Sequence, residues 1–284
     1  MSFKALLWTL VFLLLPVAVI AQDNKEVLLE DLYGKSGIEK QIAQLPMVMQ
    51  VGFDQAVAAD ERLKELPVNV IREIRASIET AFAPIKIKRT IVGECRDKLS
   101  INDLKKVIEW LESTLGRKFT QLEEAASTPE KYAEMQQFAQ KFHESPPPPE
   151  QLEIIRKLDD AVKATETSVE VAMNTRLAIT IASIASLPKE QQPTYDNLVV
   201  AIEQTRPQIE SEIRTQTIVS LLYMYRNVTY AELDRYIAFA SSPAGTSFND
   251  AAISGFKKAL LAGSYKWGEL IADILKQSTS KTEA

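Results

Sequence analysis

Residue types that build catalytic and metal sites are scarce in this 284-residue chain. It contains one cysteine, Cys95, and one histidine, His143. A zinc site needs three or four ligands, so these two residues cannot form a His/Cys zinc site. A single cysteine also excludes an internal disulfide, and Cys95 is expected to pack as a small apolar side chain. A Ser–His–Asp site would need His143 as its base, and the run of prolines beside this residue argues against that role.

Glycine and clustered positive charge are scarce as well. Nine glycines and a 46% apolar fraction favour helices over sheets. The chain has 33 Lys+Arg against 38 Asp+Glu and no basic cluster, so nucleic acid is not an expected partner. Gly34-Lys35-Ser36 is similar to the end of a phosphate-binding loop, but Leu29 stands where the first glycine of that loop would be. No cofactor, metal or catalytic residue is therefore expected.

The longest apolar run lies at the N-terminus. Lys4 precedes the uncharged residues 5–20, and Val19 and Ala21 are small residues in the −3 and −1 positions before Gln22. The run contains Pro16 and is short for a membrane span, which needs about 20 apolar residues. We expect residues 1–21 to be a signal peptide cleaved between Ala21 and Gln22, leaving an exported protein without a stable membrane span. An uncleaved membrane anchor is the alternative.

Apolar residues at helical intervals predict an all-α protein. The expected helices cover residues 27–57 with a break near 34–37, 67–83, 127–144, 151–162, 167–187, a segment from about 195 with a kink at Pro207, and 263–277.

One pattern occurs twice in the chain. Ser100 to Phe119 aligns without a gap to Thr229 to Phe248, at an offset of 129 residues. We call these segments the first and the second copy of the repeat. Identical pairs are Leu104/Leu233, Ile108/Ile237, Ser113/Ser242, Gly116/Gly245 and Phe119/Phe248, and similar pairs are Ser100/Thr229, Asp103/Glu232, Lys106/Arg235 and Trp110/Phe239.

The shared residues predict the same backbone in both copies. Ser100 and Thr229 are suited to cap a helix, with an acidic residue three positions later to complete a capping box. Ser242-Pro243 predicts that a second helix starts there, because proline is tolerated in the first helical turn. Glycine two residues after that proline would allow a close approach of the backbone. The residues offered as a candidate interaction surface are Ser100, Asp103, Leu104, Trp110, Gly116, Phe119, Thr229, Glu232, Leu233, Phe239, Ser242, Pro243, Gly245 and Phe248.

The four prolines 146–149 favour an extended, stiff segment and mark the expected domain boundary. We predict two tandem related helical bundles, residues 27–145 and 151–277, joined by a proline-rich linker at 146–150. The polar residues 278–284 are expected to form a disordered tail.

Two groups of residues could still carry function. The acidic pairs Glu109/Glu112, Glu123/Glu124 and Asp159/Asp160 could supply carboxylate-dependent hydrolysis, although solvated helix faces are the more common explanation. The cluster Tyr223-Met224-Tyr225, beside Tyr230, could line an apolar pocket, although core packing is the more common role.

The second copy resembles bacterial envelope proteins that carry domain of unknown function 2059. The resemblance rests on Thr229-Tyr-Ala-Glu232-Leu233 and on Phe239 followed by Ser242-Pro243-Ala-Gly245. The first copy departs from this pattern, because Trp110 replaces the phenylalanine and Thr114-Leu115 replace Pro-Ala. The resemblance implies an all-α protein exported by a bacterium, and it carries no established activity.

These observations predict a non-enzymatic binding or interaction module in the periplasm of a Gram-negative bacterium, with an envelope protein or an apolar ligand as its partner. A carrier of an apolar small molecule or lipid is the first alternative, and a carboxylate-dependent hydrolase of envelope polymers is the second. An apolar cavity near Trp110 or Phe239 would favour the carrier, whereas two inward-facing acids in a cleft would favour the hydrolase.

Overall fold

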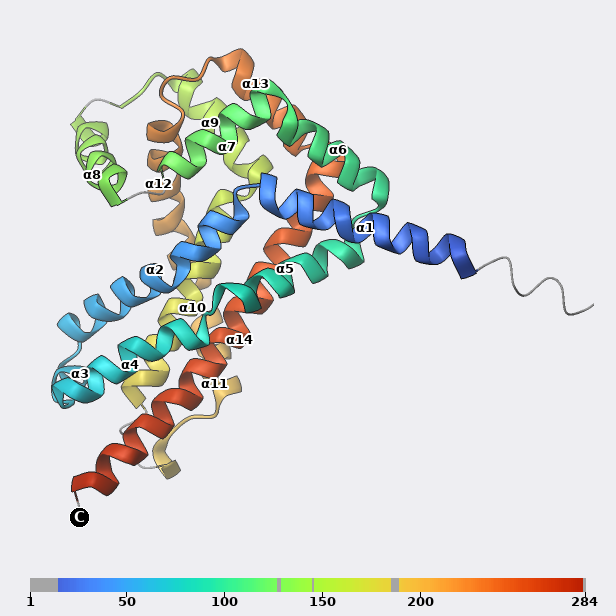
Figure 1. Ribbon diagram of the computed structural model, residues 1–284. Coiled ribbons are helices and arrows are strands. Elements are labelled where there is room, and N and C mark those ends of the chain that lie inside the picture. The colour runs from blue at the N-terminus through green and yellow to red at the C-terminus, as the bar shows by residue number, and fades with distance from the viewer. Residues whose placement is uncertain (1–14, 127–128, 145, 185–188, 283–284) are drawn as a thin grey trace, which may run out of the picture.

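The computed structural model describes residues 15–126, 129–144, 146–184 and 189–282. Within these ranges the chain is helical and contains no strand, which confirms the all-α prediction (Figure 1). The helices are α1 (Leu15–Lys35), α2 (Ile38–Ala59), α3 (Glu61–Lys64), α4 (Val68–Ala81), α5 (Pro84–Lys98), α6 (Ile101–Glu112), α7 (Thr114–Ala126), α8 (Pro129–Glu144), α9 (Pro149–Val162), α10 (Ala164–Ile184), the short 3-10 helix η1 (Lys189–Gln191), α11 (Tyr195–Glu203), α12 (Arg206–Met224), α13 (Tyr230–Ala240) and α14 (Pro243–Thr282).

Glycine and proline separate the helices near the positions that the sequence predicts. Gly37, between α1 and α2, has φ 74°, a left-handed conformation that glycine adopts at little cost. Pro67 directly precedes α4, and Pro84 begins α5. Pro148 has φ −53° and ψ 143°, close to polyproline II, and α9 starts at the next residue. The last of the four prolines is therefore the first residue of a helix.

The predicted signal peptide is only partly described. Residues 1–14, which include Lys4 and most of the apolar run, lie outside the described residues. The predicted cleavage site between Ala21 and Gln22 falls inside α1. Figure 1 shows the N-terminal end of α1 projecting beyond the other helices.

Two elements differ from the sequence-based expectation. Pro207 does not kink one helix but lies in the first turn of α12, separate from α11, because proline has no N–H to continue a helix from the preceding turn. The last helix, α14, extends from Pro243 to Thr282, well beyond the expected range 263–277. It contains no proline after its first residue, and it continues through most of the segment for which we predicted a disordered tail.

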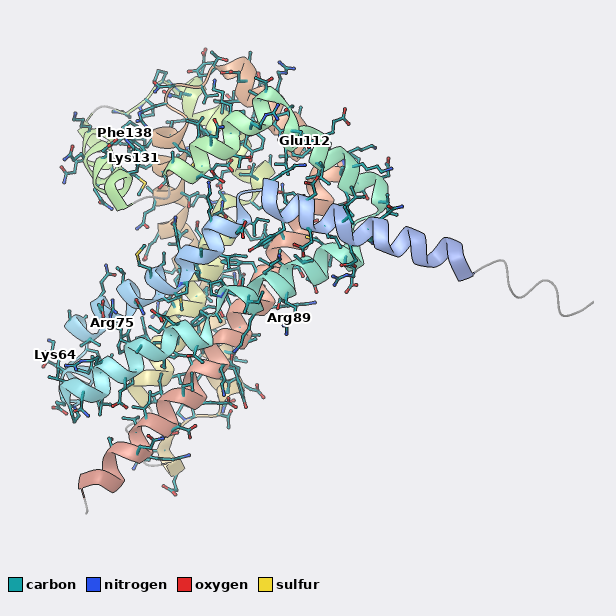
Figure 2. The ribbon with its side chains drawn as sticks, viewed as in Figure 1. Lys64, Arg75, Arg89, Glu112, Lys131 and Phe138 are labelled. Atoms are coloured by element: carbon teal, nitrogen blue, oxygen red, sulfur yellow. The ribbon has the colours of Figure 1, made fainter. Side chains whose placement is uncertain are left out.

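Three clusters of buried apolar side chains form the core. The first joins α1, α2, α4, α5 and α6 to α14, and the second joins α7 to α9, α12 and α13. The third lies between α10, α11 and α12. In the first cluster, Trp267 of α14 is 1% exposed and donates its indole N–H to the carbonyl oxygen of Ile74 at 3.1 Å and to Ser77 Oγ at 2.9 Å. Phe138 of α8, labelled in Figure 2, packs at the edge of the second cluster. Its ring centroid is 5.7 Å from that of Tyr223.

The clusters join segments from both sides of residues 146–150. Helix α14 lies in the second half of the sequence, yet its most extensive packing is against α5, α4 and α10 (Figure 1). Helix α7 lies in the first half, yet its Phe119 is buried in the second cluster. The structure therefore does not confirm two successive bundles that each enclose a core of their own.

Candidate binding pocket between the two copies of the repeat

The first helix of each copy begins with a complete capping box. Ser100 Oγ accepts a hydrogen bond from the Asp103 backbone N–H at 3.1 Å, and Asp103 Oδ2 accepts one from the Ser100 N–H at 3.1 Å. Thr229 Oγ1 and the Glu232 N–H are 3.3 Å apart, and Glu232 Oε2 and the Thr229 N–H are 3.0 Å apart. The reciprocal bonds satisfy two N–H groups that a helix start leaves free. The prediction that Ser100 and Thr229 are caps is confirmed.

The second helix of each copy also begins in the same way. Helices α7 and α14 start at Thr114 and Pro243, which are equivalent positions. Ser113 Oγ accepts a hydrogen bond from the Gly116 N–H at 2.9 Å, and Ser242 Oγ accepts one from the Gly245 N–H at 3.2 Å. The predicted helix start at Ser242-Pro243 is confirmed, and the first copy has the same start without a proline.

The third residue after each of these serines must be glycine, because the backbone of the preceding helix passes close to it. A Cβ on Gly116 would lie 2.0 Å from the Trp110 carbonyl oxygen, and a Cβ on Gly245 would lie 2.2 Å from the Phe239 carbonyl oxygen. Both distances are far below van der Waals contact, and the obstructing atoms belong to the backbone. The two obstructing carbonyls occupy equivalent positions, so both copies make the same tight turn between helices.

The two copies face each other through their central aromatic residues. The rings of Trp110 and Phe239, which are equivalent positions, stack with centroids 4.6 Å apart and planes 8° apart. Lys118 of the first copy forms an ion pair with Glu232 of the second at 2.7 Å. Contact between equivalent positions is typical of an isologous arrangement, in which an approximate two-fold axis relates the two surfaces.

A pocket of about 370 Å³ opens beside this contact. Its volume lies within the range of about 300–1,000 Å³ that is usual for small-molecule sites. Five of the predicted interaction residues line it: Trp110, Gly116, Phe119, Phe239 and Phe248. Helix α10 contributes Thr167 and Ser168 to the wall, and α12 contributes Met224 and Tyr225. Helices α2 and α5 also line the pocket, through Ile38, Gln41, Ile42 and Ile91.

The other predicted interaction residues lie in the core or at the starts of helices. Leu104 and Leu233 are buried in the first and second clusters, respectively. The capping residues lie at the outer ends of α6 and α13, away from the pocket lining, and Ser242 and Pro243 start α14. The repeat therefore supplies both the backbone of this region and the aromatic side of the pocket.

One carboxyl group lies in the pocket wall, on Glu123 of α7. Its Oε1 accepts hydrogen bonds from the hydroxyl groups of Tyr225, on α12, at 2.8 Å and of Tyr236, on α13, at 3.0 Å. Burial raises the pKa of Glu123, and the two tyrosine hydrogen bonds oppose that rise. Burial also raises the pKa of Tyr225 and of Tyr236 well above the usual value. The three side chains form a hydrogen-bonded group at the junction of three helices.

The acidic pairs named from the sequence do not converge on this pocket. Glu124, next to Glu123, forms an ion pair with Lys40 at 2.6 Å instead. Asp159 is buried and accepts hydrogen bonds from the backbone N–H and the hydroxyl of Thr165. Among the described residues that line the pocket, Glu123 is the only acidic one. The pair of carboxyl groups that glycoside hydrolysis uses is therefore not assembled there.

Sequence reasoning found part of the pocket and missed part of it. Met224 and Tyr225 line the pocket, whereas Tyr223 is buried and donates its hydroxyl hydrogen to Glu134 at 2.5 Å. Tyr236 was not singled out, although it lies three residues before Phe239 and therefore on the same helix face. That spacing is the signal that could have identified it.

The single cysteine of the chain is a buried packing residue. Cys95 is 3% exposed, and burial raises its pKa to about 12, which confirms its expected role as a packed apolar residue. The described residues include no cluster of three or more His, Cys, Asp or Glu side chains placed to hold a metal ion. The position of the His143 side chain lies outside the description. Within the described ranges, no helix has the length and apolar character that crossing a membrane requires.

Comparison with known proteins does not extend this description. No protein-family model, curated protein or solved structure matches the chain. The resemblance of the second copy to domain of unknown function 2059 therefore stays a prediction, and the geometry of the pocket is the observation from which a function is argued.

Proposed function

We propose that this chain is a non-enzymatic binding protein that holds a small apolar molecule in the pocket between the two copies of the repeat. The observation that carries the proposal is the pocket of about 370 Å³ beside the stacked rings of Trp110 and Phe239. Aromatic side chains dominate one side of it, and a few polar groups are available to orient a ligand, as is usual for small-molecule sites.

A carrier or receptor fits the pocket better than a hydrolase. The described lining contains one carboxyl group, and hydrolysis of a glycosidic bond uses two. Glu123 is also occupied by two tyrosine hydroxyls, which hold its Oε1 in place. Such a group is suited to recognise a ligand.

A protein partner is the second candidate, and α2 supports it. Met47, Val48 and Val51 of this helix are 46%, 47% and 48% exposed. They lie within two helical turns of one another, so they form an apolar strip on the surface. Exposed apolar strips of this kind often contact another protein.

We place this activity in the periplasm of a Gram-negative bacterium, after removal of residues 1–21. Lys4, the apolar run and the small residues before Gln22 have the order of a secretory signal. The end of α1 that cleavage would remove projects from the body of the protein (Figure 1). An exported binding protein of this kind would be suited to carry an apolar molecule between two membranes.

The proposal can be tested with N-phenyl-1-naphthylamine, an uncharged dye whose fluorescence rises in apolar surroundings. Ser168 lines the pocket from α10, and Ser168→Leu would fill part of the space. We expect this change to weaken dye binding at least about tenfold. Ser211→Leu, on the exposed face of α12, is the matched control and should leave binding unchanged. Equal dye affinity in both variants, with both folded, would show that the dye binds elsewhere.

Native mass spectrometry provides an independent readout. A small apolar molecule that co-purifies with the chain from the periplasm, and is absent from Ser168→Leu, would support the proposal. A stoichiometric protein partner and an empty pocket would instead support the exposed strip on α2.

A further inference from the structure

We propose that the ligand is an organic cation, an apolar molecule with an ammonium group that pairs with Glu123. This inference rests on the proposed binding function and names the chemical class of the ligand. It depends on the charge of the pocket lining, on the fixed position of one carboxyl group, and on the aromatic rings around it.

The described residues that line the pocket include an acidic side chain and no basic one. The described lining combines apolar side chains with uncharged polar ones, including Gln41, Thr120 and Asn249. Glu123 is the only acidic residue among them, and no described lysine, arginine or histidine lines the pocket. A ligand with a carboxylate or phosphate would therefore place a negative charge beside the carboxyl group of Glu123. A ligand with an ammonium group would bring the opposite charge.

The carboxyl group of Glu123 is held in a defined position. Tyr225 and Tyr236 both donate to its Oε1, at 2.8 Å and 3.0 Å, from two different helices. These bonds restrict the side chain before a ligand arrives, so less conformational freedom is lost on binding. They also favour the ionised carboxylate, which is the form that attracts a cation.

Burial of Glu123 favours a ligand that carries a positive charge. Loss of water around Glu123 raises the pKa of its carboxyl group, so the surroundings disfavour its charged form. A cation placed beside the carboxylate offsets this cost, and hydrogen bonds between ionised partners are stronger than those between neutral ones. An alcohol of the same size would offer the carboxylate only a neutral hydrogen-bond donor.

The aromatic lining also suits a cation. Trp110, Phe119, Tyr236, Phe239, Phe248 and Phe256 line the pocket with Glu123. The faces of aromatic rings carry partial negative charge and attract ammonium groups, whereas they do not attract carboxylates. The same rings accept an apolar body, so one pocket can hold both parts of such a ligand.

The test compares three ligands of equal length on the mature chain, residues 22–284. Decylamine, decanol and decanoate are titrated calorimetrically at pH 7, each below the concentration at which it forms micelles. We expect decylamine to bind at least about tenfold more tightly than decanol, and decanoate to bind more weakly than both. This comparison needs no variant and therefore does not depend on whether a variant folds.

Two neighbouring glutamates on α7 provide matched variants. Glu123→Gln keeps an oxygen that can accept both tyrosine hydrogen bonds but removes the charge. Glu124→Gln removes a charge that pairs with Lys40 on the surface. Glu123→Gln should abolish the preference for decylamine over decanol, whereas Glu124→Gln should retain that preference.

The outcomes separate the two proposals. Equal affinity for decylamine and decanol, or an unchanged preference in Glu123→Gln, would overturn the assignment of a cation and leave an apolar binding pocket in place. Tighter binding of decanoate would also overturn it. Failure of all three ligands to bind would reject the pocket as a binding site, and the assignment with it.

Discussion

The two copies of the repeat share a backbone and differ in what surrounds them. In both, a capped helix of about three turns is followed by a serine, a new helix and a glycine against the preceding carbonyl. The second helix then differs, because α7 has 13 residues and α14 has 40. The comparison shows that the residues retained in both copies determine the path of the chain, whereas the residues that differ determine its packing partners.

The long helix of the second copy is held to both halves of the chain. Adjacent lysines of α14 pair with acids on different helices, Lys257 with Glu170 of α10 at 3.0 Å and Lys258 with Glu94 of α5. At Gly255 an added Cβ would lie 2.6 Å from Ile91 Cα, so α14 and α5 cross in close contact. Helix α7 has no counterpart of this extension, and it packs in the second cluster.

The largest effect is expected where the copies agree most closely, at Gly116 and Gly245. Gly116→Val and Gly245→Val should each reduce the free energy of unfolding by about 3 kcal/mol or more, because the Cβ itself would overlap a backbone oxygen. Alanine should cost nearly as much for the same reason. Chemical denaturation followed by circular dichroism measures the loss.

Gly93 supplies the control for these substitutions. It lies inside α5, and an added Cβ there would meet no atom within 4 Å apart from the neighbouring backbone of its own helix. Gly93→Ala should stabilise the protein by about 0.5–1 kcal/mol, since alanine loses less backbone freedom in a helix. A loss at Gly245 no greater than about 1 kcal/mol would mean that the turn can open, and the shared backbone would then not depend on glycine.

Local features of the sequence were sufficient to predict these turns. A capping box, a serine before a helix start and a proline in a first turn each act within a few residues, so their effect can be predicted without the fold. The helix boundaries near Gly37, Pro67 and Pro84 were predicted for the same reason.

Packing between distant helices could not be predicted in this way. The length of α14 depends on its contacts with α4, α5 and α10, which are far from it in the sequence. The hydrogen-bonded group of Glu123, Tyr225 and Tyr236 combines three helices, and each of these residues alone has the appearance of an ordinary surface or core residue. The predicted division at residues 146–150 assumed that neighbours in sequence share a core, and α14 departs from that assumption.

An intermediate effect is expected where the copies touch, at Trp110 and Phe239. A double-mutant cycle with Trp110→Leu and Phe239→Leu should give a coupling of about 0.5–1.5 kcal/mol, the usual range for a stacked aromatic pair. A second cycle, with Trp110→Leu and Phe82→Leu, should be additive within about 0.5 kcal/mol, because Phe82 directly follows α4, a helix that lies well apart from α6 (Figure 1). Equal coupling energies in both cycles would show that Trp110 couples to the core in general and not specifically to Phe239 in the other copy.

The smallest effect is expected in how far the two capping boxes make the free energy of unfolding depend on pH. The hydrogen bonds from Lys118 and from Thr229 lower the pKa of Glu232 to about 2. The pKa of Asp103 is also lowered, but the hydrogen bonds that lower it come only from Ser100. A carboxyl group with a lowered pKa stabilises the fold above its unfolded value, and this stabilisation is lost as the pH falls. For Glu232 the loss should occur between pH 4.5 and about 2.

Glu232→Gln isolates this contribution, because glutamine can still accept the hydrogen bond of the capping box. Its unfolding free energy, measured in urea at steps from pH 6 to pH 2, should fall less on acidification than that of the unaltered chain. Asp103→Asn should reduce the acid dependence by a smaller amount, because no cation from the other copy pairs with Asp103 among the ion pairs of the described residues. Lys118→Met should reproduce most of the effect of Glu232→Gln. An equal change in Glu232→Gln and Asp103→Asn would indicate that the ion pair between the copies adds nothing to the cap, and that the two boxes are equivalent in energy as well as in geometry.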